Sequence, residues 1–481
     1  MKKLAITAVA LSLLLSACSS NNSSEVPPTI TQEPSYTNVS VHDPSVIKVD
    51  DTFYVFGSHL ASAKSEDLIE WTQVSDIVRT GNPLIPNVHD ELSEALSWAE
   101  TQTLWAADVI QLADGRYYMY YNACRGDAPL SAMGVAIADN IEGPYKDAGI
   151  FLKSGMTEEM SHDGTPYDAT KHPNAVDPDT FFDKDGKLWM VYGSYSGGIF
   201  ILEMDPETGF PLPDQGYGKK LVGGNHSRIE APYMQYSPET GYYYLFLSYG
   251  GLDSFGGYNI RVARSKTPDG PFLDPQGQDM LDSKGAEGSV FDDLSIEPYG
   301  AKLMGGYQFE ASDGTTAGYV APGHNSTYYD EEDGEYFIFF HTRFPDGGEF
   351  HEVRVHQFFM NADGWPVVAP YRYSGEKLGS YKENQVRGEY QLINHGKDIT
   401  ADVKEPDTIT LAKNGKITGD VEGTWKLDGE NNAELTIDGV TYKGKFVQGW
   451  SEAEEKELTT FTALSDEGVS IWGSRIVTAS E

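Results

Sequence analysis

The chain has 481 residues, of which 39% are hydrophobic and 12% aromatic, enough for a packed core in one large domain and a smaller one. Its 29 Tyr, 50 Gly and 25 Pro favour short strands and tight turns over long helices, so we expect an all-β protein. The formal net charge of -38 opposes binding of nucleic acid or of a polyanionic sugar chain, which leaves a neutral ligand as the better partner, although acidity also serves solubility.

The first residues are typical of an exported lipoprotein. Two Lys residues precede an apolar run over residues 4–15, which is shorter than the roughly 20 residues that span a bilayer; an uncleaved membrane helix is the alternative. The sequence Leu-Ser-Ala-Cys that ends at Cys18 resembles a lipoprotein cleavage site. We therefore predict a signal peptide over residues 1–17, a lipid on Cys18, and a flexible tether over residues 18–36.

The remaining cysteine has no partner for a disulfide if Cys18 carries lipid. Cys124 is then expected to be a small buried hydrophobic residue. We expect a monomer that touches the membrane only through the lipid on Cys18.

One pattern occurs five times within residues 37–375. A polar or acidic residue opens an apolar strand, a turn follows, and a strand rich in Tyr, Phe and Val comes next. The copies begin at His42, Trp105, Asp177, Glu230 and His324. Asp-Gly dipeptides in several of the turns accept the backbone angles of tight hairpins. Units of this kind stack radially, so we predict a five-bladed β-propeller, with a β-sandwich as the alternative.

The blade pattern stops before residue 376. Residues 376–481 alternate apolar and polar side chains between Asn-Gly and Asp-Gly turns, which predicts a small antiparallel β domain, barrel-like in form. This segment contains no evident catalytic set, and it is expected either to bind polysaccharide or to cover a face of the propeller.

Acidic residues open most copies of the repeat. If each copy begins the innermost strand of its blade, five side chains point at the mouth of the central channel: Asp43, Asp108, Asp177, Glu230 and His324. Clustered buried carboxylates raise one another's pKa values and lower stability, so such a set serves chemistry or a cation.

Hydrolysis of a glycosidic bond uses one protonated carboxyl and one carboxylate. Asp43 is the candidate base and Glu230, with its longer side chain, the candidate acid, whose pKa Asp177 would raise. The alternative for any single member is that it caps a turn or holds a structural ion.

Three short segments in this order resemble glycoside hydrolase family 43. They are His-Asp-Pro-Ser-Val at 42–46, Asn-Ala-Val-Asp-Pro at 174–178 and Arg-Ile-Glu-Ala-Pro-Tyr at 228–233. Residues 105–109, 322–326 and 351–356 make the chain similar to the bacterial two-domain endo-1,5-α-L-arabinanases of that family. The resemblance covers nearly the whole chain after the signal peptide, including the C-terminal β domain.

The resemblance implies an inverting hydrolase that cleaves internal α-1,5-arabinofuranosyl bonds of linear arabinan. By that resemblance Asp43 is the general base, Glu230 the general acid and Asp177 the residue that adjusts and orients the acid. The base and acid of an inverting site lie roughly 6.5 to 9.5 Å apart, which admits a water.

The resemblance also implies a calcium ion on the propeller axis, next to His324 and held largely through water; a simple buried histidine is the alternative. Trp105 resembles the aromatic residue that stacks on a sugar ring, although Ala107 stands where many members of the family have Pro. The alternative for Trp105 is that its side chain is part of the blade core. Asp108, Asn174 and Ser194 are expected to line the substrate site, or to be structural.

Two other functions remain open at this point. An exo-acting arabinofuranosidase or β-xylosidase would use the same acids, and the loops over residues 81–103 and 162–170 would shape the cleft that decides between them. A non-catalytic lipoprotein that captures glycans is the alternative from another class, but it would not need Asp43, Asp177 and Glu230 together.

Overall fold

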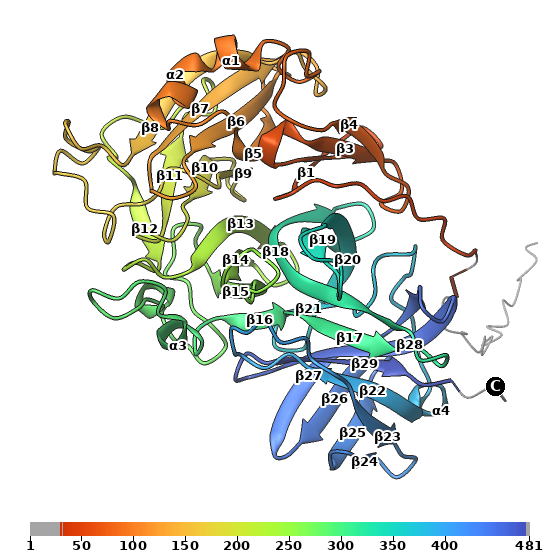
Figure 1. The fold of residues 1–481 in the computed structure, drawn as a ribbon. Coiled ribbons are helices and arrows are strands. Elements are labelled where there is room, and N and C mark those ends of the chain that lie inside the picture. The colour runs from red at the N-terminus through yellow and green to blue at the C-terminus, as the bar shows by residue number, and fades with distance from the viewer. Residues whose placement is uncertain (1–28, 31, 478–481) are drawn as a thin grey trace, which may run out of the picture.

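The computed structural model describes residues 29, 30 and 32–477 (Figure 1). The predicted signal peptide, Cys18 and much of the predicted tether lie outside the described residues. No helix within the described part of the chain is long and apolar enough to cross a membrane.

The larger part of the molecule is a five-bladed β-propeller, as predicted (Figure 1). Each of the first three blades is an antiparallel sheet of four strands that neighbour one another in chain order. Blade 1 contains β1 (Ser45–Val49), β2 (Thr52–Phe56), β3 (Ser62–Ser65) and β4 (Thr72–Ser75). Blade 2 contains β5 (Trp105–Gln111), β6 (Tyr117–Cys124), β7 (Ser131–Ala138) and β8 (Lys146–Ser154). Blade 3 contains β9 (Asp179–Phe182), β10 (Leu188–Tyr192), β11 (Ile199–Met204) and β12 (Lys219–Val222).

The last two blades differ in size. Blade 4 contains β13 (Ile229–Ser237), β14 (Tyr242–Tyr249), β15 (Asn259–Ser265) and β16 (Ala301–Met304). Blade 5 contains β17 (Tyr307–Glu310), β18 (Thr316–Asp330), β19 (Glu335–Arg343), β20 (Glu352–Met360) and β21 (Pro366–Val368). The fifth copy of the repeat therefore does not open its strand: β18 begins at Thr316, and His324 lies in its middle because β18 also pairs with β17.

Short helices occupy the connections. They are α1 (Val88–Glu91) and α2 (Ser93–Trp98) between blades 1 and 2, α3 (Asp293–Ile296) in blade 4, and α4 (Glu383–Val386) before the second domain. Two 3₁₀ helices cover Ser58–Leu60 and Met280–Asp282.

The second strand of a blade is apolar on both faces because a neighbouring blade packs on each side. Every residue of β6 is buried, for example, so its sequence reads as a continuous apolar and aromatic run rather than as an alternation. Tyr118 and Tyr120 of β6 pack with Met190 and Tyr192 of β10 in the core between blades 2 and 3.

The C-terminal domain is a closed eight-stranded barrel, which confirms the predicted small antiparallel β domain. Its strands are β22 (Gly388–Asn394), β23 (Asp407–Leu411), β24 (Lys416–Gly419), β25 (Gly423–Asp428), β26 (Asn432–Ile437), β27 (Val440–Ser451), β28 (Lys456–Ser465) and β29 (Ser470–Arg475). The barrel packs beside blades 4 and 5 (Figure 1). Trp472 of the barrel is fully buried and meets the Tyr307 ring with centroids 4.9 Å apart, so the two domains share one core cluster.

Candidate active site

The chain makes a similar backbone turn where each blade reaches the propeller axis. Asp43, Ala106, Asp177, Ala231 and His324 have φ values of 59°, 38°, 54°, 54° and 46°. Residues other than glycine rarely adopt such angles, and strain of this kind concentrates at functional sites. Strands β5, β13 and β18 also shift register beside these residues, which redirects their side chains.

Asp43 lies at the centre of a group of histidines. Its Oδ1 is 2.9 Å from Nδ1 of His324, its Oδ2 is 2.8 Å from Nδ1 of His42, and Ser58 donates a hydrogen bond to Oδ2. Burial raises the pKa of Asp43, but the interactions with His324 and His42 outweigh burial and hold that pKa well below its usual value. Asp43 is therefore ionised at neutral pH, as a general base must be.

Glu230 and Asp177 are the other two carboxyls of this ring. Ser194 donates to Glu230 Oε2 at 2.7 Å and Tyr258 donates to Oε1 at 2.8 Å, while the backbone N–H of Ala231 donates to Asp177 Oδ2 at 3.2 Å. Burial raises the pKa of Glu230, and repulsion from Asp43 adds to it. Burial also raises the pKa of Asp177 to about 8, with repulsion from Glu230 and Asp43 adding to the effect and His324 opposing it. This acidic pair keeps a proton near neutral pH.

Asp108 does not join this ring, contrary to the expectation from sequence. The residue of blade 2 with the positive φ is Ala106, and Asp108 comes two positions later, one layer deeper along the axis. Asp108 is 3% exposed, Ser45 donates to its Oδ1 at 2.7 Å, and the N–H of Thr180 donates to its Oδ2 at 2.9 Å. With both oxygens engaged below the ring, Asp108 is not placed to bind sugar hydroxyls.

The other predicted lining residues divide by their contacts. Asn174 is buried and accepts hydrogen bonds from Ser131 and Ser154, so it supports the chain before Asp177 rather than facing a ligand. Ser194 is buried and bonds to Glu230, so it positions an acid. Trp105 is half-buried at the start of β5, so part of its side chain remains exposed.

His324 is suited to hold an oxygen-liganded cation through one nitrogen. Its Nδ1 faces Asp43, which leaves Nε2 available, and a carboxylate behind a histidine is a common arrangement at metal sites. Repulsion among the carboxylates would be offset by a cation at this position. Burial lowers the pKa of His324, but Asp43 and Asp177 raise it to about 9, so a proton occupies the imidazole when no ion does. The residues therefore fit the predicted ion. His42, Asp43 and His341 also bring ligand atoms within 4.8 Å of one another, but two imidazoles suit calcium poorly.

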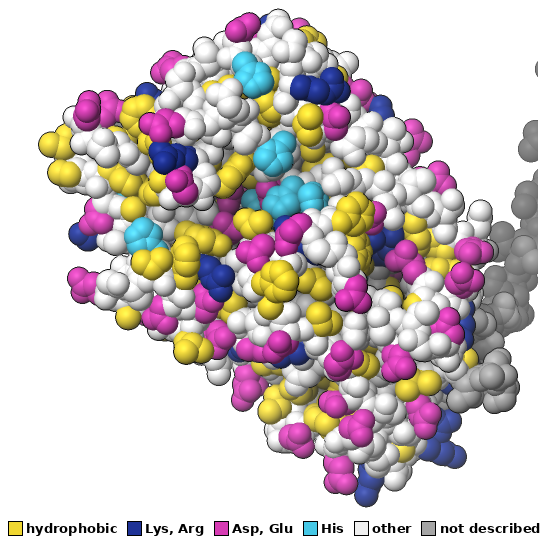
Figure 2. Space-filling model, in the orientation of Figure 1, with side chains coloured by type: hydrophobic (Ala, Val, Ile, Leu, Met, Phe, Trp, Pro, Cys, Tyr) yellow, Lys and Arg dark blue, Asp and Glu magenta, His cyan; other side chains and the backbone are white. Residues whose placement is uncertain are grey.

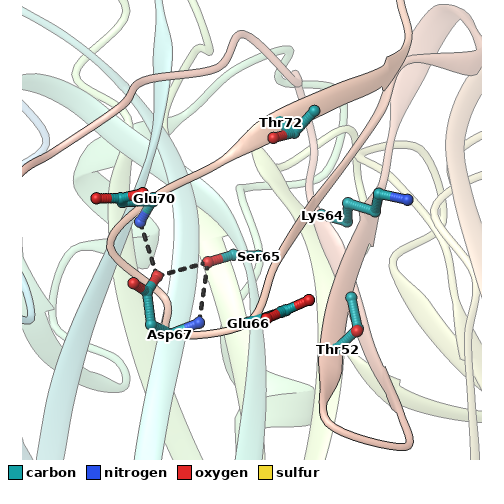
Figure 3. A pocket seen from close by; sticks show the side chains of 7 residues that line it. All are labelled: Thr52, Lys64, Ser65, Glu66, Asp67, Glu70 and Thr72. Carbon is teal, nitrogen blue, oxygen red and sulfur yellow. Dashed lines mark hydrogen bonds between the residues drawn. The ribbon is translucent and has the colours of Figure 1, made fainter.

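The face of the propeller that carries the ring is hollowed at its centre. Figure 2 shows histidine and acidic side chains gathered in this hollow. By contrast, the cavity of about 270 Å³ in Figure 3 lies on the outer strands of blade 1, where Asp67 is bonded to Ser65 and to the N–H of Glu70. No aromatic residue lines that outer cavity.

Comparison with known proteins places this geometry in a family. The family model described as glycosyl hydrolases family 43 matches residues 36–293, more than half of the chain. The chain belongs to glycoside hydrolase family 43. A second model, a C-terminal lipocalin-like domain found with this family, matches residues 370–473 and coincides with the barrel.

Several relatives of this family 43 hydrolase are similar over almost their full length. The chain is 65% identical to extracellular endo-α-(1→5)-L-arabinanase 2 of Bacillus subtilis, over 92% of this chain and 94% of the relative. It is 54% identical to the extracellular endo-α-(1→5)-L-arabinanase of Thermotoga petrophila, whose crystal structure superposes with a TM-score of 0.89 over 92% of this chain and all of the other. A crystal structure of a family 43 hydrolase from Bacillus licheniformis, 64% identical, gives a TM-score of 0.91 over the same shares.

Sequence reasoning missed the residues that hold the acids of this family 43 site. Ser58 follows β2, Tyr258 precedes β15 and His341 lies in β19, so none belongs to the repeat. Only the fold reveals the place of Tyr258: a Cβ on Gly323 would lie 2.0 Å from the Tyr258 ring, so the glycine before His324 makes room for that tyrosine.

The two donors to Glu230 give a first prediction. Both hydrogen bonds lower the pKa of Glu230, so Ser194→Ala or Tyr258→Phe is expected to raise it and to move the alkaline limb of the kcat/KM profile to higher pH by up to about one unit. The measurement is kcat/KM against pH. Tyr120→Phe is the matched control, because Tyr120 also loses one buried hydrogen bond, to Gly209, without touching the acids. An unmoved alkaline limb in both variants would contradict the role of these donors.

Proposed function

We propose that this family 43 protein is an exported, inverting endo-1,5-α-L-arabinanase that cleaves internal bonds of linear arabinan. The observation that carries the proposal is the ring in which an ionised Asp43 faces the proton-holding pair of Glu230 and Asp177. The names of the two curated relatives at 65% and 54% identity support the substrate, the internal mode of cleavage and the extracellular location.

Asp43 acts in this proposal as the general base. It takes a proton from a water molecule, whose oxygen attacks the anomeric carbon on the face opposite the leaving group. His324 and His42 hold the carboxylate in place and keep it ionised, and Ser58 fixes Oδ2.

Glu230 acts as the general acid. Its proton passes to the glycosidic oxygen as the bond to the anomeric carbon breaks, so that the departing chain leaves as an alcohol. Asp177 keeps the proton on the pair by repulsion, and Ser194 and Tyr258 orient the carboxyl of Glu230. Trp105 offers its ring to a sugar beside the cleaved bond.

The proposal is tested by sizing the products released from debranched linear arabinan, with xylan and p-nitrophenyl arabinofuranoside assayed alongside. Mixed short arabino-oligosaccharides are the expected products. Arabinose alone would indicate exo action, and binding of arabinan without cleavage would indicate a capture protein.

Calcium at His324 gives a second prediction. The ion, bound through Nε2 of His324 and through water, would supply positive charge that offsets the three carboxylates. Chelation is therefore expected to lower kcat at least about tenfold and to lower the melting temperature, with both restored by added Ca²⁺. The His324→Ala variant should not respond to chelator. Full activity in protein shown by elemental analysis to be free of metal would contradict the proposal.

We also propose that lipid on Cys18 anchors the exported protein, which gives a third prediction. Cells that express the chain and are fed labelled palmitate should yield a labelled protein that enters the detergent phase. The Cys18→Ser variant should lose both properties, whereas Cys124→Ser should keep them because Cys124 is buried in blade 2. An unlabelled wild-type protein in the aqueous phase would overturn the anchor.

A further inference from the structure

A cavity of about 950 Å³ lies beside the active site, at the ends of blade 2. Its walls include Trp98 and Glu100 after helix α2, Arg125 after β6, and Tyr167 in the loop between blades 2 and 3. Both loops predicted from sequence to shape the cleft, residues 81–103 and 162–170, therefore line it. A cavity of this size exceeds what one sugar ring fills and suits an oligosaccharide segment.

Strand β6 and Trp105 link the wall of the cavity to the catalytic ring. Asn122 in β6 accepts a hydrogen bond from the N–H of Asp177, and Arg125 comes three residues later, roughly 10 Å along the strand. Trp105 pairs with Asn122 across β5 and β6, and a Cβ on Gly126 would lie 3.5 Å from the Trp105 ring. Trp105 thus lies between the acids and the cavity.

Two aromatic side chains are held in fixed positions on the cavity wall. The indole N–H of Trp98 donates to the carbonyl of Ser154 at 3.2 Å, and Lys153 lies 4.3 Å from the Trp98 ring centroid. The hydroxyl of Tyr167 donates to the carbonyl of Pro173 at 3.0 Å. Both rings stay half-buried, so each keeps an exposed portion of fixed orientation, which is what stacking on a sugar ring requires.

The charges of the wall select a neutral ligand. Arg125 is the cation among the lining residues, and its guanidinium is already paired with Glu100 at 2.6 Å and with Asp127 at 2.5 Å. Glu158 and Glu159 add negative charge. An anionic sugar chain would be repelled, whereas the hydroxyls of a neutral chain find both donors and acceptors here.

We infer that this cavity is a distal subsite that binds several arabinofuranosyl residues of the same chain whose bond is cleaved at Glu230. This inference rests on the proposed function. A long chain that also occupies this subsite binds more tightly than a short one, so the enzyme discriminates by chain length as well as by the sugar next to the cleaved bond.

The experiment compares kcat/KM on linear arabinan with kcat/KM on arabinotriose for the purified protein. The ratio of the two values is expected to fall about tenfold in Trp98→Ala and severalfold in Arg125→Ala, mainly through KM on the long chain, and to stay near the wild-type ratio in Trp98→Phe. Arg116→Ala is the matched control: Arg116 pairs with Asp114 at the far end of blade 2 and is about as exposed as Arg125.

The outcomes separate the subsite from the proposed function. A wild-type protein that cleaves arabinan, with an unchanged ratio in both Trp98→Ala and Arg125→Ala, would overturn the subsite alone. Equal losses on the long and short substrates in Trp98→Ala would assign Trp98 a structural role and would also overturn the subsite. Arg125→Ala breaks only exposed ion pairs, so it tests the subsite in a variant that should still fold. A wild-type protein that releases no arabino-oligosaccharide would overturn the proposed function and the subsite with it.

Discussion

Replacing Glu230 by Ala is expected to lower kcat/KM on linear arabinan by about 10³-fold or more, because the leaving sugar alkoxide then departs without a proton. The loss should depend on the leaving group. An aryl glycoside of an arabino-oligosaccharide with an acidic phenol leaves without protonation, so Glu230→Ala should retain much of the wild-type activity on that substrate. Asp43→Ala should lose activity on both substrates, since the attacking water needs its base whatever group departs.

The comparison of the two substrates distinguishes an acid from a base, which a simple loss of activity does not. Glu376→Gln is the matched control, because Glu376 is also buried, with a pKa raised by burial to about 7, but bonds to Ser374 away from the ring. Circular dichroism and melting temperature should match the wild type in all variants. If Glu230→Ala lost both substrates equally and Asp43→Ala kept the aryl glycoside, the two roles would have to be exchanged.

The repeat made the fold and most of the ring predictable. Asp43, Asp177 and His324 occupy the positive-φ position of a similar local turn in their blades, and Glu230 directly precedes that position, Ala231, in blade 4. The residue types at these turns are visible in a single sequence, so the four side chains could be brought together without coordinates. The prediction of the ring depended on aligning the five copies of the repeat correctly. It was wrong for Asp108, where the copy in blade 2 was aligned out of register.

Blade 2 shows how the alignment slipped. Strand β5 shifts register between Trp105 and Asp108, so Ala106 takes the position that Asp43 and Asp177 hold in their blades. Asp108 then corresponds to Ser45 and Asp179, two residues further along their strands, and lies with them in the deeper layer. A bulge inserts one residue into a strand without changing the strand's composition or apolar character, so it leaves no mark in the sequence. Sequence alone therefore aligns Asp108 with Asp43 and Asp177, where the structure has Ala106.

The residues that support the ring could not be predicted for a different reason. His341 of blade 5 contacts Asp43 of blade 1 from 298 positions along the chain, and Tyr258 reaches Glu230 from the loop before β15 of the same blade; neither contact carries a sequence period. The role of His341 depends on how blade 5 closes against blade 1, which is a property of the assembled propeller, and that of Tyr258 depends on how one loop folds within blade 4.

The pH dependence of Asp177→Asn tests the electrostatic part of the mechanism. When Glu230 and Asp177 release the last proton that they hold between them, two carboxylates are left side by side. Their repulsion opposes this ionisation and raises its pKa. With Asn at 177 the repulsion is gone, so Glu230 releases its proton at lower pH. A general acid works only while protonated, and activity is lost as pH rises through its pKa. The alkaline limb of the kcat/KM profile is therefore expected to move to lower pH by about one unit or more, which lowers kcat/KM about tenfold at pH values above the wild-type limb.

The matched control for that experiment lies two residues away. Burial and the neighbouring Asp108 raise the pKa of Asp179 well above its usual value, so Asp179 is protonated at neutral pH and Asn replaces one neutral side chain by another of the same shape. Its Oδ2 accepts from the N–H of Met234, a bond that the amide oxygen of Asn can keep. Asp179→Asn should leave the alkaline limb in place. A limb that moves equally in both variants would show that loss of any axial carboxyl shifts the profile, whereas a limb that moves only in Asp177→Asn assigns the effect to repulsion within the pair that delivers the proton.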